Sequence, residues 1–134
     1  MIPIAKPYLT ADEAQAAYDT ILTGWITQGP RVAEFEEKFA AYTGAKYAVA
    51  VSNCTTALHL AMIVAGVGPG DEVICPSMSY IATANSVKYV GAIPVFAEVN
   101  PANYNLDIND TARKITSKTK AILLVHQIGM PADI

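Results

Sequence analysis

The chain has few of the residues that characterise several classes of protein. It holds two cysteines, Cys54 and Cys75, which are too few for a disulfide framework and are expected to be free thiols. Nine basic residues stand against twelve acidic ones, and because the basic residues are scattered they provide no patch for nucleic acid. Apolar runs fall short of the roughly 20 residues that span a bilayer, and the N-terminus lacks the apolar core of a signal peptide. We therefore expect a cytoplasmic protein without nucleic-acid or membrane partners.

Apolar residues, by contrast, are abundant. The 134 residues are 52% hydrophobic and 16% charged, a composition typical of a well-buried interior and not of a disordered chain. The length is typical of one compact domain and is short for an enzyme with two domains.

Residues 1–46 predict two helices and a loop. Thr10 is expected to cap a helix that ends at Gly24, because acidic residues follow in its first turn. The run "WITQGPRV" joins Gly to Pro and predicts a loop, after which apolar residues recur on one face of a second helix that ends at Gly44.

Residues 47–134 predict alternating strands and helices. Four apolar runs predict strands: Tyr47 to Val51, Glu72 to Cys75, Ile93 to Val99 and Ala121 to Val125. They lack strict polar alternation, which is typical of parallel strands covered on both faces. The expected fold is therefore α/β, with three layers in which helices flank a mostly parallel sheet. Ligands of such sheets bind beyond the carboxyl ends of the strands, where residues 52–56, 76–80, 100–104 and 126–129 are expected to meet.

The first of these segments, in "VSNCTTALHL", places hydroxyls and an amide where a helix begins. Ser52, Asn53, Thr55 and Thr56 could cap the unpaired backbone N–H groups of the first turn. This is the interpretation that the stretch alone favours. The alternative is an anion site, since those N–H groups and the helix dipole suit a phosphate.

Tyr80 follows the second predicted strand, in "CPSMSYIATANS", on the same edge as the hydroxyl cluster. An aromatic ring there could lie flat on a planar ligand, or it could pack inward at the start of the next helix. Residues alone leave both readings open.

Other chemistry is poorly supported. The glycines of "GVGPGD" end a helix and precede a strand, whereas a dinucleotide-binding fingerprint follows a strand and opens a helix. His59 and His126 have no CxxC or HxxxH partners, so no zinc site is expected, and no GxSxG turn supports a hydrolase.

The sequence resembles a known family over essentially its whole length. The stretches "GWITQGPRVAEFEEKFAAYTGAKYAVAVSNCTTALHLA", "GVGPGDEVICPSMSYIATANSVKYVGAIPVFAEVNPANYNLD" and "TKAILLVHQIGMPAD" are similar to the N-terminal part of the DegT-type sugar aminotransferases, perosamine synthases among them. The resemblance implies the large, cofactor-binding domain of the type I pyridoxal-phosphate aminotransferase fold, here partial and spanning residues 1–134. It also implies a nucleotide-linked keto-sugar and an amino-group donor as substrates.

The resemblance implies cofactor contacts at four positions. Thr55 and Thr56 match the loop that holds the cofactor phosphate, and Tyr80 matches the aromatic residue that stacks on the pyridine ring. Cys54 stands where many relatives carry glycine, and its small thiol need not abolish the cradle. The loop "GWITQGP" resembles one that in relatives lies near the dimer interface and active site.

By the same resemblance the chain has no catalytic residue of its own. The Schiff-base lysine, the Asp that pairs with the pyridine nitrogen and a neighbouring Gln belong to sequence that would follow Ile134, and no lysine present matches: Lys6, Lys38, Lys46, Lys88, Lys114, Lys118 or Lys120. A transaminase needs that lysine to anchor the cofactor and move a proton. Two interpretations follow: a truncated piece of a sugar aminotransferase, favoured because "HQIGMPADI" ends in mid-motif, or a non-catalytic half-domain that binds a phosphate-bearing ligand or a partner protein.

The resemblance also implies an order of strands in the sheet: the last three predicted strands would be neighbours, and Tyr47 to Val51 would lie apart from them. An apolar strand with unpaired backbone groups must be covered. It could pair within the chain, most plausibly with Ala121 to Val125, or two copies could complete each other's sheets. We favour self-association, and therefore expect a homo-oligomer.

Overall fold

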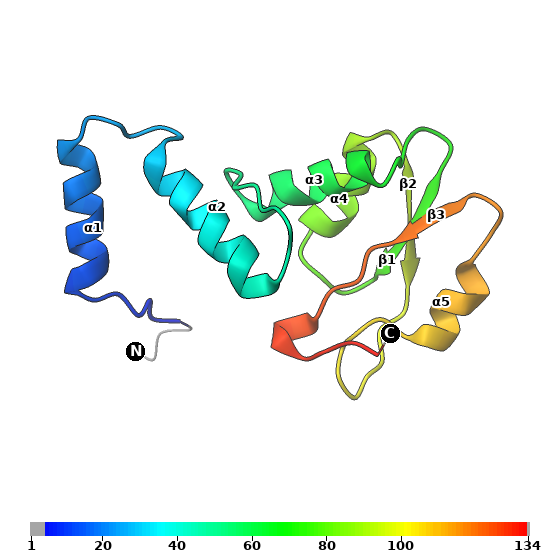
Figure 1. Cartoon of the computed structure of the whole chain (residues 1–134). Coiled ribbons are helices and arrows are strands. Elements are labelled where there is room, and N and C mark those ends of the chain that lie inside the picture. The colour runs from blue at the N-terminus through cyan, green and yellow to red at the C-terminus, as the bar shows by residue number, and fades with distance from the viewer. Residues whose placement is uncertain (1–4, 134) are drawn as a thin grey trace. The chain divides into compact units, whose positions relative to one another are not determined.

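A computed structural model describes residues 5–133, and the chain divides into two compact units, Met1–Ala50 and Val51–Ile134. Figure 1 labels the elements along the chain. Each unit is described by itself.

Two capped helices form the N-terminal unit. Helix α1, Ala11–Leu22, begins at Thr10, whose hydroxyl accepts from Asp12 N at 3.2 Å while Glu13 accepts from Thr10 N at 2.6 Å. Helix α2, Pro30–Thr43, begins after Gly29 and ends at Gly44, which has a left-handed φ of 73°. Both predicted helices are confirmed.

The loop between these helices is closed by the tryptophan side chain. Trp25 Nε1 donates to the carbonyl oxygen of Gln28 at 2.7 Å. The indole also covers Gly29 so closely that a Cβ atom there would lie 2.4 Å from Trp25 Nε1. A side chain at this position would therefore displace the ring.

The predicted strand Tyr47 to Val51 is wrong, because the structure assigns no strand to these residues. A strand exists only through ladder hydrogen bonds to a neighbour. Here the N–H of Ala50 instead donates to Glu36 Oε1 of α2 at 2.7 Å. The internal pairing with Ala121 to Val125 is not formed either, since the strand in that region pairs with another neighbour.

Three parallel strands form the sheet of the C-terminal unit, in the order β2-β1-β3. Strand β1, Glu72–Pro76, is central; β2, Ile93–Ala97, pairs with it in the register Ile74 to Val95, and β3, Thr119–Ile122, in the register Ile74 to Ile122. The expectation of adjacent parallel strands is confirmed. Strand β3 begins and ends earlier than predicted, although Leu123 N still donates to the carbonyl oxygen of Ile74 at 2.8 Å.

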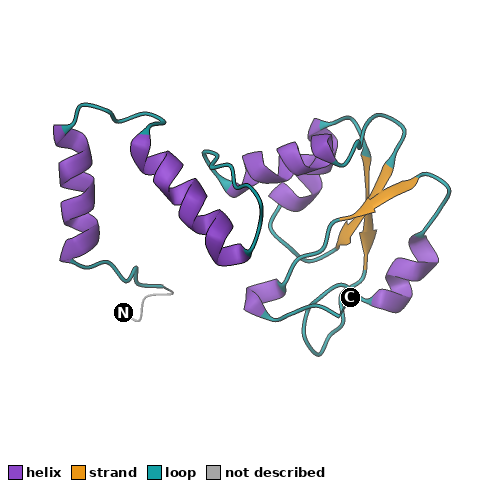
Figure 2. Ribbon diagram, in the orientation of Figure 1, coloured by secondary structure: helices purple, strands orange, loops and turns teal. Residues whose placement is uncertain are grey.

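Helices cover both faces of this sheet (Figures 1 and 2). Helices α3, Cys54–Val64, and α4, Ala82–Tyr89, pack against each other on one side, and α5, Ile108–Lys114, contacts β2 on the other. The fold is thus α/β with a parallel sheet between helical layers, as predicted.

The alternation of side chains along β1 produces two separate cores. Val73 joins a cluster with Met62 of α3 and Val87 of α4, whereas Ile74 joins a cluster with Ala97 and Leu106. Successive residues of a strand point to opposite faces. Both Val73 and Ile74 are fully buried, so β1 contributes to both cores of this unit.

Candidate cofactor site

The start of α3 gathers the predicted hydroxyl cluster by hydrogen bonds. Asn53 is the N-cap: its Oδ1 accepts from Thr56 N at 2.9 Å and from Thr56 Oγ1 at 3.2 Å. Ser52 Oγ lies 3.2 Å from Thr56 Oγ1. The capping interpretation is confirmed, with the amide of Asn53 as the capping group.

Capping by Asn53 leaves part of the first turn available to an anion. The N–H groups of Cys54 and Thr55 precede the capped one and have no acceptor within the helix, because the first N–H groups of any helix lack one. The positive end of the helix dipole lies at the same place. Ser52, Asn53 and Cys54 are exposed, so their side chains do not bury these N–H groups. The residues present therefore fit a phosphate group.

Tyr80 lies in the loop between β1 and α4, after the strand as predicted. The loop leaves β1 through Ser77, whose N–H donates to the carbonyl oxygen of Ala97 at 2.8 Å, and the carbonyl oxygen of Tyr80 accepts from Thr83 N at 3.0 Å. The Tyr80 side chain is 77% exposed. It does not pack inward, and its ring is available to a ligand. Among the described residues no hydrogen bond or ring contact joins Tyr80 to the α3 cluster.

The parallel strands bring three loops to one edge of the sheet. Residues 77–81 follow β1, 98–107 follow β2 and 123–129 follow β3, so their starts share the carboxyl edge. The segment 52–56 follows no strand, and the sheet does not position it as the sequence predicted.

Sequence analysis missed Asn105, which joins two of these loops. Its side chain is buried and hydrogen-bonds to residues that follow β3. The available signal was a polar amide directly before the apolar Leu106 in the run "NYNLD", a pattern that also occurs in ordinary turns. Only the tertiary contacts show that Asn105 joins two loops and is not an ordinary turn residue.

The alternatives that the sequence disfavoured receive no support from the described residues. Gly66 and Gly70 have φ values of 68° and 92° and form the turn after α3, as expected. His59 packs edge-on against Tyr89 with ring centroids 5.4 Å apart. Within residues 5–133 no three His, Cys, Asp or Glu side chains are grouped as metal ligands. No helix in that range is long and apolar enough to cross a membrane.

A cleft of about 510 Å³ lies elsewhere, in the N-terminal unit. It is lined by the end of α1, the loop with Trp25 and Ile26, and the start of α2 with Arg31 and Glu34. None of the predicted cofactor residues lines it, so this cleft is not the site described above.

Comparison with known proteins gives a family match over residues 7–134, to the DegT/DnrJ/EryC1/StrS aminotransferase family. A GDP-perosamine synthase of Caulobacter vibrioides is 47% identical over 134 residues, 99% of this chain and 36% of that protein. The Bacillus subtilis spore coat polysaccharide biosynthesis protein SpsC is 41% identical, over 99% of this chain and 34% of its own length.

Solved structures agree with the sequence matches. The PLP-form of a putative sugar aminotransferase from Streptococcus pneumoniae superimposes with a TM-score of 0.93 at 38% identity, covering 98% of this chain and 34% of that one. A 3-amino-5-hydroxybenzoic acid synthase gives a TM-score of 0.89 at 40% identity, over 96% of this chain and 33% of its own. This chain thus spans about a third of the length of the proteins it matches. The family depends on pyridoxal phosphate, and the chain belongs to the DegT/DnrJ/EryC1/StrS aminotransferase family.

Proposed function

We propose that this chain is the cofactor-binding N-terminal part of a pyridoxal-phosphate aminotransferase that aminates a nucleotide-linked keto-sugar. The substrate class rests on relatives whose names include GDP-perosamine synthase and UDP-4-amino-4-deoxy-L-arabinose–oxoglutarate aminotransferase, each at more than 40% identity. The particular sugar is outside this proposal, because the relatives' names differ in sugar and nucleotide.

The observation that carries the proposal is the cluster at the start of α3. The N–H groups of Cys54 and Thr55, together with the hydroxyls of Thr55 and Thr56, would hold the cofactor phosphate. The Thr56 hydroxyl, which donates to Asn53 Oδ1 in this structure, would rotate to donate to the phosphate instead. Tyr80 would place its exposed ring against the pyridine ring. When bound, pyridoxal phosphate supplies an electron sink for breaking bonds at the substrate carbon that carries nitrogen.

We propose that the chain by itself holds this cofactor weakly and does not transaminate. This part of the proposal rests on the resemblance, by which residues 1–134 include no match to the family's Schiff-base lysine or to the Asp partner of the pyridine nitrogen. We propose as its partners the nucleotide-sugar, an amino-group donor and a second copy of the chain. The proposed location is the cytoplasm. Residues 1–134 would form one partial cofactor-binding domain.

Titration of the chain with pyridoxal phosphate, followed by absorbance, tests the proposal. We expect weak, saturable, non-covalent binding that inorganic phosphate competes away. Replacing Thr55 and Thr56 with valine should weaken it by roughly 1–3 kcal/mol, because hydrogen bonds to a charged group are lost. Thr43→Val is the matched control, since the Thr43 hydroxyl donates to the carbonyl oxygen of Phe39 within α2.

Three results would contradict the proposal in different ways. Borohydride trapping of the cofactor on one native lysine would show that the chain has an anchoring lysine. Unchanged affinity in the double valine variant would show that the two hydroxyls do not bind the phosphate. Binding of phosphate without preference for pyridoxal phosphate would favour the alternative, a stand-alone module for a phosphate-bearing ligand or a partner protein.

A further inference from the structure

Asn105 is a buried side chain whose hydrogen bonds all reach a distant part of the chain. It is 2% exposed and lies between β2 and α5, next to the bridge that joins Val99 to Leu106. Its Oδ1 accepts from Gln127 N at 2.9 Å, and its Nδ2 donates to the carbonyl oxygens of Met130 at 3.1 Å and Pro131 at 3.0 Å. One amide therefore ties both ends of the segment 127–131 to the loop after β2.

The segment that Asn105 holds contains an unusual backbone conformation. Ile128 has a φ of 52°, in the left-handed region that β-branched residues rarely adopt. Its side chain is 92% exposed, so packing within this chain does not hold it there. Hydrogen bonds hold it instead. Two belong to the turn itself, from Gly129 N to the carbonyl oxygen of His126 at 3.2 Å and from Met130 N to that of Gln127 at 2.9 Å. The others are those of Asn105 and the one from Ala132 N to His126 Nδ1, at 3.0 Å.

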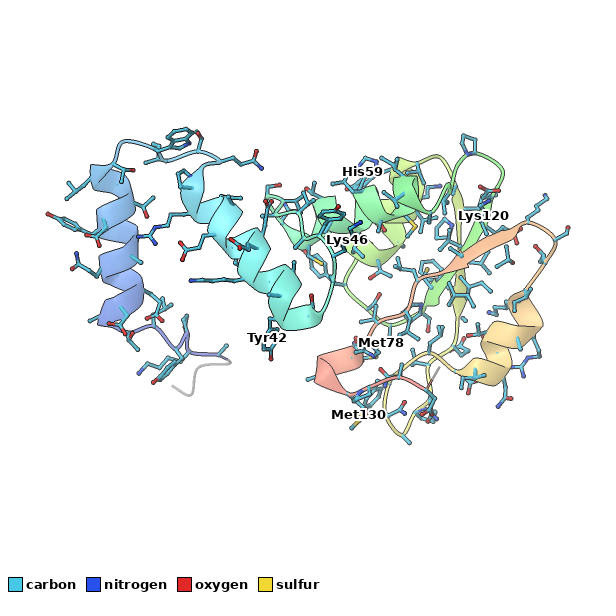
Figure 3. All side chains as sticks on the ribbon, in the orientation of Figure 1. Tyr42, Lys46, His59, Met78, Lys120 and Met130 are labelled. Atoms are coloured by element: carbon cyan, nitrogen blue, oxygen red, sulfur yellow. The ribbon has the colours of Figure 1, made fainter. Side chains whose placement is uncertain are left out.

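This segment lies at the same sheet edge as the loop that carries Tyr80. β1 and β3 are parallel with Ile74 opposite Ile122, and Leu123 N still donates to the carbonyl oxygen of Ile74, so the chain after β3 and the loop after β1 leave the sheet at the same edge. Figure 3 labels Met130 in the segment that Asn105 holds and Met78 in the loop after β1. The two loops thus leave neighbouring strand ends.

We infer that Asn105 is a positioning residue of the cofactor site: it fixes the backbone of residues 126–131, and that backbone forms the wall of the site on the β3 side. The inference rests on the proposed cofactor function. Asn105 does not touch the ligand and acts through the segment it holds. A leucine of similar size would fill the same volume and leave the Gln127 N–H and two carbonyl oxygens without their partner.

Two measurements on the 134-residue chain test this inference. The first is hydrogen exchange of the Gln127 amide, which reports whether the segment is held. The second is the dissociation constant of pyridoxal phosphate at a temperature where every variant is folded. Asn105→Ala should speed exchange of Gln127 and weaken binding, each by about tenfold, which is the change for loss of one modest interaction.

A graded variant and a matched control separate positioning from general stability. Asn105→Asp keeps the acceptor for Gln127 N and loses the donor to Met130 and Pro131, so it should preserve Gln127 protection and still weaken binding. Thr111→Val is the control: Thr111 is 7% exposed and its hydroxyl donates to the carbonyl oxygen of Asp107 at 2.7 Å, in α5. It should lower the melting temperature and change neither measurement.

If Asn105→Ala does not fold, Ile128→Gly added to it should restore folding, because glycine adopts the left-handed conformation without strain. The double variant should still show fast exchange at Gln127 and weak binding. The inference would be overturned if hydrogen exchange of the Gln127 amide were unchanged in Asn105→Ala, or in the double variant with Ile128→Gly. It would also be overturned if exchange were faster while the affinity for pyridoxal phosphate stayed the same. If the unsubstituted chain does not bind pyridoxal phosphate, the proposed function fails and the site role of Asn105 with it. The exchange data would still decide separately whether Asn105 holds the segment.

Discussion

Replacing Gly29 with alanine should displace the single tryptophan of the chain. The new Cβ atom would lie 2.4 Å from Trp25 Nε1, 2.6 Å from Cδ1 and 2.8 Å from Cε2. Non-bonded heavy atoms settle at about 3.5 Å or more, so the indole must move by about 1 Å. Gly29 has an extended φ of −170°, which any residue adopts. The effect therefore comes from the clash and not from backbone strain.

The expected cost follows from the contact that the movement breaks. The indole N–H donates to the carbonyl oxygen of Gln28 at 2.7 Å, and a neutral hydrogen bond contributes about 0.5–1.5 kcal/mol to stability. Trp25 is 56% exposed, so water replaces part of the lost interaction and the lower end, about 0.5 kcal/mol, is expected.

Tryptophan fluorescence measures this change directly, because Trp25 is the chain's one tryptophan. In Gly29→Ala we expect a shifted emission maximum and stronger quenching by acrylamide as the ring leaves its position over residue 29. Gly68→Ala is the matched control, since among the described residues, its two chain neighbours aside, no atom lies within 4 Å of a Cβ atom there, and its φ is not left-handed. Identical emission and quenching in Gly29→Ala and the unsubstituted chain would refute the reasoning.

Three further predictions concern single groups and the assembly. A thiol reagent at pH 8 should label exposed Cys54 and spare Cys75, because burial raises the pKa of the Cys75 thiol to about 11. Pyridoxal phosphate should slow the labelling of Cys54, and denaturant should make both thiols reactive. The pKa of Asp110 is lowered mainly by the hydrogen bond that its carboxylate accepts from Glu98 N, and further by Lys114 and Arg113. The ionised carboxylate therefore stabilises the fold at neutral pH, and this stabilisation is lost as the pH falls through the folded-state pKa. Asp110→Asn should therefore flatten the acid limb of stability in urea titrations, whereas Glu37→Gln, at an exposed position, should not. Sedimentation at micromolar concentration should show self-association, because within residues 5–133 β2 and β3 are the edge strands of the sheet, and a clean 14.2 kDa monomer would contradict it.

Local signals in the sequence predicted most of the elements. Thr10 and Glu13 form the expected capping box, and Gly44 ends α2 in the left-handed conformation. The apolar run at β1 lacks polar alternation because this central strand is buried on both faces. Such signals involve residues a few positions apart, so they can be read without knowing the fold.

Pairing was harder to predict. The run "YAVAV" has the composition of a buried strand, yet Ala50 bonds to Glu36 and no ladder forms. Composition reports the preference of a segment, whereas a strand also requires a neighbour. For the same reason the boundaries of β3 shifted towards the residues that face β1.

The sequence by itself determined the α/β class, the cap of α1 and, through resemblance, the family, and it predicts cofactor contacts at Cys54, Thr55, Thr56 and Tyr80. The tertiary structure decided that Asn53 provides the cap and that the ring of Tyr80 is exposed. It alone revealed Asn105, whose partners lie 22 to 26 residues away. Propensity and capping act between near neighbours, so the order of residues encodes them visibly. A buried amide instead becomes decisive only when folding brings distant backbone groups within hydrogen-bonding distance.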